Sequence, residues 1–197
     1  MNRRMMIKLF VIATASALFV RLFVVENYRI ASNSMFPNLK TGELIFVAKS
    51  AFSIKLPLSS YEVFKVARPK RSDIVAFSLP QKGETTHVKR VVAIAGDRVE
   101  IREGNLFVND KPSDYQQMNS EVRGLASAES KLELEQVEGS QPYQVQMDRQ
   151  MMANYGPIDV PTNHFFVLGD NRVESIDSRT WGPVPYSCLK GKVLATF

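Results

Sequence analysis

Residues 28–39 read Tyr-Arg-Ile-Ala-Ser-Asn-Ser-Met-Phe-Pro-Asn-Leu, and they join an apolar N-terminal segment to a body of short strand-like stretches. Two hydroxyls in this stretch, those of Ser32 and Ser34, flank Asn33, a residue that tolerates left-handed backbone conformations. Pro37 stiffens the chain just beyond them. A serine on such a constrained loop suits a nucleophile, although serines in polar loops are common and an ordinary turn is the simpler interpretation.

The segment before this stretch predicts a membrane anchor. Residues 1–8 are basic, and residues 9–25 are apolar apart from Arg21. About 17 apolar residues are the lower limit for a transmembrane helix. The basic tail is expected to stay in the cytoplasm, which places everything after Glu26 on the far side of the membrane.

Two other interpretations compete with an anchor. A cleaved signal peptide is one, because Ala13-Thr14-Ala15 and Ala15-Ser16-Ala17 look like small-residue cleavage sites. Only about six apolar residues would precede such a cut, fewer than the roughly 7–15 that signal peptides use. A buried helix of the body is the other, but the basic flank and the lack of a polar face count against it. We therefore expect an uncleaved, single-pass anchor.

Composition limits the class of protein. The chain has 197 residues, of which 45% are hydrophobic and 23% charged, as expected for one folded core. The net charge is +5, but no arginine-rich run or aromatic-interleaved basic patch accompanies it, so nucleic acid is not an expected partner. Cys188 is the only cysteine, so no intrachain disulfide can form. His87 and His164 stand far apart without a third ligand nearby, so no metal site is expected.

Short apolar stretches separated by turn residues follow the opening loop. The stretches that read as strands are 42–48, 74–77, 87–94, 98–101, 106–108, 164–168 and 191–197. The first is expected to be buried on both faces, and residues 51–61 to form a long loop. Because no βαβ alternation is present, the fold class is mainly β, with an antiparallel-sheet body.

Residues 111–154 differ from the rest. They are rich in Ser, Gln and Glu and lack a sustained strand pattern, so we expect an inserted smaller subdomain without catalytic residues, with a short helix over residues 125–137. The predicted organisation is a cytoplasmic tail (1–8), a transmembrane anchor (9–25), a β domain (26–110 and 155–197) and the insert (111–154).

Lys89 is the candidate partner for a serine nucleophile. A serine needs a base near neutral pH, and neither histidine has a convincing context. In the strand 87–94, Lys89 shares a face with Val91 and Ala93, and Arg90 adds positive charge nearby. Desolvation and a neighbouring cation both lower the pKa of a lysine from its usual value of about 10.4. A lysine at a sheet edge is the alternative interpretation.

Four blocks of sequence together resemble a known family. They read Tyr28-Arg29-Ile30 with Ser32-Asn33-Ser34-Met35-Phe36-Pro37, Arg71-Ser72-Asp73-Ile74-Val75, Lys89-Arg90-Val91-Val92 with Gly96-Asp97-Arg98-Val99, and Gly169-Asp170-Asn171-Arg172 with Ser175, Asp177-Ser178-Arg179 and Trp181-Gly182. In order and spacing they resemble the bacterial type I signal peptidases, membrane-anchored serine endopeptidases that remove signal peptides from exported proteins. The resemblance runs from the anchor to Val184 and omits most of residues 111–154.

The resemblance implies a role for particular residues. Ser34 would be the nucleophile and Lys89 the general base, a Ser-Lys variant of the catalytic triad. Ser32 would donate its hydroxyl to the oxyanion hole, and Ser175 would orient the lysine amine. A further pair, Asp177 and Arg179, would support the loop that carries Ser175.

The resemblance also implies the substrate. Exported pre-proteins would present small side chains at positions −1 and −3 to shallow pockets formed partly by Ile30, Met35, Leu39 and Val88. The lipid bilayer would be the second partner, and no metal or organic cofactor is needed.

Some positions depart from the family pattern. Ala31 stands where proline is usual, Asn33 and Ser72 where glycine is usual, and Val173-Glu174 where an Asp-Asn pair is typical. These changes suggest a divergent member, accessory or plasmid-borne, in which Asn33 takes the backbone conformation of a glycine.

Three alternatives stay open. A conjugative-transfer or pilin-maturing peptidase of the same fold would act on one dedicated substrate. A Ser-Lys self-cleaving repressor is disfavoured by the apolar N-terminus. A non-catalytic, membrane-anchored β domain that binds exported segments belongs to a different class.

Overall fold

The computed structural model describes residues 3–19, 24–55, 62–79, 85–118 and 130–196. Within these residues the helices are α1 (Arg3–Phe19) and α2 (Ser178–Trp181), and the short 3-10 helices are η2 (Asn33–Met35), η3 (Lys49–Ala51) and η5 (Tyr186–Cys188). The strands are β1 (Val25–Arg29), β2 (Leu44–Ala48), β3 (Ser53–Lys55), β4 (Glu62–Lys65), β5 (Ile74–Ser78), β6 (Thr86–Ile94), β7 (Arg98–Arg102), β8 (Asn105–Val108), β9 (Lys111–Pro112), β10 (Asp114–Gln117), β11 (Lys131–Gln136), β12 (Tyr143–Met147), β13 (Tyr155–Asp159), β14 (His164–Leu168), β15 (Val184–Pro185) and β16 (Leu189–Thr196).

A seven-stranded sheet forms the centre of the body, in the order β1-β2-β16-β5-β6-β14-β15. Every neighbouring pair in it is antiparallel, so the mainly β, antiparallel prediction is confirmed. The strands predicted over 74–77, 87–94 and 164–168 correspond to β5, β6 and β14, which lie side by side. β5 and β14 are apolar almost throughout, and β6 is apolar from Val91 to Ile94, which suits strands that are covered on both faces.

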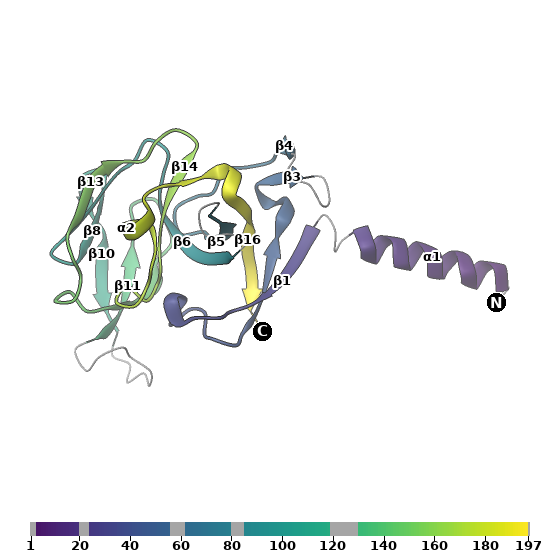
Figure 1. Cartoon of the computed structure of the whole chain (residues 1–197). Helices are drawn as coiled ribbons and strands as arrows, with labels where there is room; N and C mark the ends of the chain where they lie inside the picture. Colours follow the sequence, from purple (N-terminus) through teal and green to yellow (C-terminus); the bar gives the residue numbers. More distant parts are fainter. Residues whose placement is uncertain (1–2, 20–23, 56–61, 80–84, 119–129, 197) are drawn as a thin grey trace.

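The β body has a second part. Figure 1 shows β8, β10, β11 and β13 together at one end, β1 and β16 at the other, and β5, β6 and β14 between them. Val145 and Met147 of β12 pack in one hydrophobic cluster with Phe166 and Leu168 of β14. The described residues of the stretch 111–154 therefore share a core with the large sheet, and the separation of this stretch as a subdomain remains a prediction.

The helix predicted over residues 125–137 is wrong where the structure describes it. Residues 131–136 form β11, which pairs with β10 and β12, whereas residues 119–129 lie outside the described residues. The sequence Lys-Leu-Glu-Leu-Glu-Gln alternates with the two-residue period of a strand. The alternation does not separate a buried face from a solvated one, because Glu133 and Glu135 are themselves buried, 6% and 0% exposed.

Strand β6 carries an irregularity that affects the predicted face of Lys89. Phe166 of β14 pairs with Ala93 and the next residue, Val167, pairs with Val91, so Val92 is an extra residue in β6. Such a bulge interrupts the alternation of side chains. Val91 therefore packs in the cluster of Phe77 and Phe165, but Ala93 packs on the opposite side with Val92.

Two other predictions need correction. The strand at 42–48 was expected to be buried on both faces, but burial alternates along β2, where Ile45 and Val47 are fully buried and their neighbours only half-buried. One face of this strand is thus left partly open to solvent. The loop expected over 51–61 contains β3, which pairs with β4, and its residues 56–61 lie outside the described residues.

Helix α1 extends beyond the β body in Figure 1. It begins at Arg3 rather than at residue 9, because the basic residues of the tail are good helix formers. Val25, the last residue of the predicted anchor, already belongs to β1 and pairs with Ala48. In the parts of the chain that are described, no helix is both long and apolar enough to cross a membrane.

Candidate active site

The loop after β1 presents Ser34 at the centre of a short helical turn. Ser32 is extended, with φ −145° and ψ 161°, and η2 follows directly, closed by a hydrogen bond from the Phe36 N–H to the Asn33 carbonyl. Asn33 therefore adopts a helical and not a left-handed conformation, which corrects the glycine-like role expected for it. Its side-chain oxygen instead accepts a hydrogen bond of 2.7 Å from the Thr41 hydroxyl.

Strand β6 brings Lys89 to this serine. The Lys89 Nζ donates to Ser34 Oγ over 2.5 Å, although the two residues are 55 positions apart in the chain. Lys89 is 5% exposed, with its stem enclosed by the body. The Ser32 hydroxyl donates to the same Ser34 oxygen over 3.2 Å. Ser32 and Lys89, both predicted as site residues, thus meet at the Oγ atom of Ser34.

Burial is the main cause of the altered acidity of Lys89. Desolvation disfavours the charged amine and lowers its pKa from 10.5 to about 8, although the carboxylates of Asp177 and Asp170 act in the opposite direction. The cation that assists this lowering is Arg179. Arg90, the cation expected in that role from its position next to Lys89, is instead paired with Asp170. Near pH 8 the amine is neutral in a substantial fraction of molecules.

The chain segment after β14 lies directly behind the serine. The Asn171 N–H donates to the Ser34 carbonyl over 3.1 Å. At Gly169 the approach is closer still, because a Cβ there would lie 2.4 Å from the Ser34 carbonyl oxygen and 2.1 Å from Ser175 Oγ. Only glycine fits between these groups. The segment of Gly169 and Asn171 therefore holds the backbone of Ser34 in a fixed position.

Ser175 lies beside this glycine, but the hydrogen bond expected between its hydroxyl and the Lys89 amine is not present in the described part of the chain. The Lys89 amine donates to Ser34 instead. The hydroxyl does lie near the Asp177 carboxylate. Burial favours the neutral form of Asp177, but the hydrogen bonds and the charge of Arg179, together with the Gly169 N–H, hold its pKa below the usual value.

Asp177 and Arg179 form the predicted ion pair. Two guanidinium nitrogens of Arg179 each donate to an Asp177 carboxylate oxygen over 2.8 Å. Arg179 also donates to the carbonyls of Arg172 and Ser175, and Asp177 accepts from the Gly169 N–H over 2.9 Å. The pair thus ties the loop of Ser175 to the glycine that contacts Ser34.

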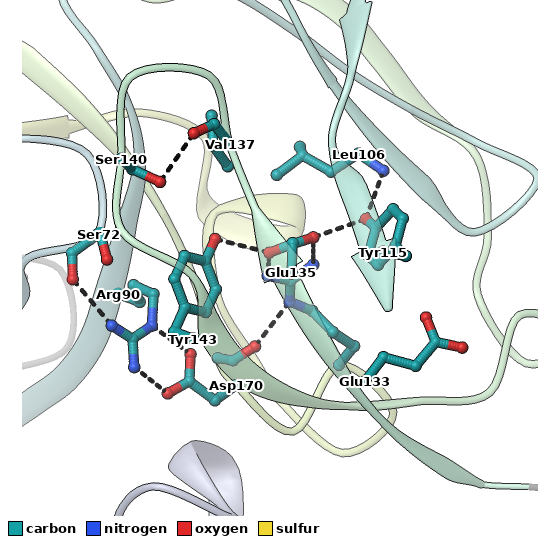
Figure 2. Close-up of polar contacts among 12 residues, drawn as sticks. Ser72, Arg90, Leu106, Tyr115, Glu133, Glu135, Val137, Ser140, Tyr143 and Asp170 are labelled. Atoms are coloured by element: carbon teal, nitrogen blue, oxygen red, sulfur yellow. Dashed lines mark hydrogen bonds and ion pairs between the residues drawn. The ribbon is translucent and has the colours of Figure 1, made fainter. Parts of the chain in front are cut away.

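A second ion pair was not identified from the sequence. Arg90 donates two hydrogen bonds of 2.7 Å to Asp170 and one of 2.8 Å to the Ser72 carbonyl, as Figure 2 shows. Asn38, four residues after Ser34, donates to the same Asp170 over 2.8 Å. Both Arg90 and Asp170 lie within the blocks that resemble the family, which marks each as a residue of interest. Neither the sequence pattern nor the spacing indicates that the two side chains form a pair.

The third ion pair is fully buried. Glu135 of β11 accepts hydrogen bonds of 2.6 Å from the hydroxyls of Tyr115 and Tyr143 (Figure 2). It also accepts from both terminal nitrogens of Arg172. Burial opposes ionisation of Glu135, but the Arg172 charge more than offsets it and keeps the pKa of the carboxyl below its usual value. Arg172 in turn donates to the Gly169 carbonyl over 3.0 Å. The stretch predicted to be non-catalytic thus supports the segment behind Ser34.

Two hollows meet at Ser34 and Lys89. The first, of about 360 Å³, is also lined by Ile30, Met35 and Val88, three of the four predicted pocket residues. The fourth, Leu39, is 2% exposed and packs in the core behind them. The second hollow, of about 430 Å³, lies toward the loop of Ser175.

Another hollow, of about 480 Å³, lies elsewhere on the body, between the β3–β4 region and β15. It is the largest of the three hollows, but neither Ser34 nor Lys89 lines it, so it is not part of this site.

A serine hydroxyl in contact with a buried amine of lowered pKa, on an antiparallel β body, is the arrangement that hydrolases with a serine nucleophile and a lysine base use. Residues 3–197 match the family described as "Signal peptidase, peptidase S26". The chain belongs to this signal peptidase family and is a serine endopeptidase.

The sequences of two signal peptidases are similar to most of this chain. Signal peptidase I of Pseudomonas fluorescens is 34% identical over 193 residues, which cover 91% of this chain and 67% of that protein. Signal peptidase I of Bacillus licheniformis is 31% identical over 88% of this chain and 76% of that protein. The crystal structure of a signal peptidase I from Enterococcus faecalis V583 is 30% identical and covers 66% of this chain and 100% of its own, with a TM-score of 0.43.

Proposed function

We propose that this chain removes signal peptides from exported pre-proteins at a membrane surface, with Ser34 as the nucleophile and Lys89 as the general base. The observation that carries the proposal is the 2.5 Å contact between Ser34 Oγ and the buried Lys89 Nζ. Membership of the signal peptidase family supports the substrate class.

The proposed reaction is acyl transfer through the serine. Neutral Lys89 accepts the Ser34 proton as the serine oxygen forms a bond to the scissile carbonyl carbon. The Ser32 hydroxyl and the Ser34 N–H stabilise the oxyanion. The lysine then gives its proton to the departing amine, the peptide bond breaks, and water releases the acyl group and regenerates the serine.

The proposed specificity comes from the first hollow. Its lining by Ile30, Met35 and Val88 leaves room for small apolar side chains, which suits the −1 and −3 positions of a signal peptide. The extended substrate would lie along a strand edge. A dedicated conjugative-transfer or pilin-maturing peptidase would use the same chemistry, so a general pre-protein and a pilin precursor are offered in parallel.

The proposed location is the inner membrane, with the β body on the extracytoplasmic face. The anchor predicted at residues 9–25 would end before Val25, because that residue belongs to β1. The basic tail at 1–8 and the apolar run that follows it support this orientation. An anchor confines enzyme and pre-protein to one surface, which raises the concentration of each near the other.

The test is cleavage of a model pre-protein by purified wild type and by Ser34→Ala and Lys89→Ala. Each substitution is expected to lower kcat by about 10³-fold or more, because it removes one member of a pair that acts as a unit. Thermal unfolding of both variants verifies that they remain folded. Variants that cut as fast as wild type would contradict the assignment of the site, and a wild type that binds but never cuts would favour the non-catalytic alternative.

A further inference from the structure

The two hollows at the nucleophile lie on different sides of it. Ser32, Ser34, His87 and Lys89 line both of them. Beyond these shared residues the first continues along β1, and the second continues toward Glu174, Ile176 and Trp181. In the proposed function the first hollow holds the side chains before the scissile bond. A peptide whose scissile carbonyl lies at Ser34 therefore continues into the second hollow with the residues after that bond.

Among the residues that the structure describes, Glu174 is the only acidic one that lines the second hollow. Its backbone N–H donates to the Asn171 side-chain oxygen over 3.2 Å, and its carboxylate accepts from the Asn171 amide over 3.0 Å. Asn171 is itself 1% exposed and donates its own N–H to the Ser34 carbonyl. The carboxylate is thus exposed to a ligand but held at a defined position relative to the nucleophile.

The neighbours of this carboxylate suit a long cationic side chain. Ile176 is 61% exposed and Trp181 is half-buried, so both offer apolar surface beside Glu174. Lysine and arginine side chains lay their methylene stems along such surface while the charged end reaches a polar partner. A short or acidic side chain would gain neither contact, and an acidic one would be repelled.

We propose that Glu174 is a specificity-determining residue, which favours substrates with Lys or Arg at the first or second position after the scissile bond. The proposal rests on the proposed function, because that function sets which hollow receives the departing segment. It deepens the substrate class from pre-proteins with small residues before the cut to pre-proteins whose mature N-terminus is cationic.

The test uses full-length enzyme and three peptides that are identical up to the scissile bond and carry Ala, Lys or Glu at both following positions. The kcat/KM values are measured at one pH and at low ionic strength. We expect wild type to prefer the Lys peptide over the Ala peptide by about two- to fivefold, the range of an exposed ion pair. Glu174→Gln removes this preference, Glu174→Lys reverses it toward the Glu peptide, and added salt weakens it.

A matched control is Glu138→Gln, which makes the same change at an exposed glutamate whose carboxylate pairs with Lys111. It should leave the order of the three peptides unchanged. Equal rates for all three peptides with wild type, or a preference that survives in Glu174→Gln, would overturn the proposal. Failure of the proposed function has a different signature, because wild type would then cleave none of the peptides or Ser34→Ala would cleave them all.

Discussion

Lys89 illustrates how one residue acquires its chemistry from its surroundings. Two carboxylates, Asp177 and Asp170, act to keep its amine charged, yet the pKa still falls to about 8 because burial removes the hydration of the ammonium group. The contact with Ser34 was predicted from the sequence and is present in the structure. The hydrogen bond expected between Lys89 and Ser175 is absent from the described residues, and the Ser175 hydroxyl lies beside Gly169.

The first prediction at this scale concerns pH. The base acts when neutral, so kcat/KM for a peptide substrate should fall about tenfold per pH unit below a limb near pH 8, and should level off above it. Asp177→Asn removes the largest charge that raises this pKa and should move the limb downward. A pH–rate profile measures both. A limb near the value of about 10.4 for a solvated lysine would contradict a buried amine.

At the scale of single elements, β11 carries the most unexpected chemistry. A strand of alternating Leu and Glu would ordinarily place its carboxylates in water, but Glu135 is fully buried against Arg172 and Glu133 accepts two hydrogen bonds of 2.7 Å from Arg149. Arg172 also donates to the Gly169 carbonyl, so this strand contributes to the position of the loop behind Ser34.

Glu135→Gln tests this arrangement. The substitution keeps the side-chain volume but leaves the Arg172 charge buried without its counter-ion, so the free energy of unfolding should fall by about 3–5 kcal/mol. Glu138→Gln is the matched control on the same chain segment, because its ion pair with Lys111 is exposed and contributes about 0–1 kcal/mol. Denaturant unfolding measures both variants. Equal losses would mean that the buried pair has no special role in stability.

At the scale of the whole molecule, the site is assembled from distant segments. Ser34 follows β1, Lys89 lies in β6, and the segment behind the serine follows β14, while Asn38 reaches Asp170 across 132 positions of the chain. Figure 1 places these strands in one continuous body, with α1 beyond its edge. The chemistry thus resides in the β body, and α1 contributes no residue to it.

Removal of residues 1–23 should leave peptide cleavage intact but weaken cleavage of substrates in a membrane. We expect the shortened chain to cleave a short soluble peptide with the same kcat/KM as the full chain. Cleavage of a pre-protein inserted in lipid vesicles should fall by about tenfold or more, because the shared surface no longer concentrates the two partners. Both rates are compared in one detergent-free buffer. An equal loss on both substrates would instead assign the N-terminal segment a part in folding.

Sequence alone determined the features that depend on near neighbours. The strand character of residues 74–77 and 164–168 follows from predominantly apolar runs between turn residues, and that of 87–94 from the apolar run at 91–94 that ends it. The matched blocks around Ser34 and Lys89 indicated the family and the pair of residues.

The tertiary structure decided what depends on distant partners. The bulge at Val92, the helical conformation of Asn33 and the burial of Glu135 each arise from contacts made elsewhere in the chain. Whether a carboxylate is buried depends on whether a guanidinium meets it, and the partner of Glu135 lies 37 positions away. No local pattern contains that information, because the cost of burying a charge is set by the whole fold.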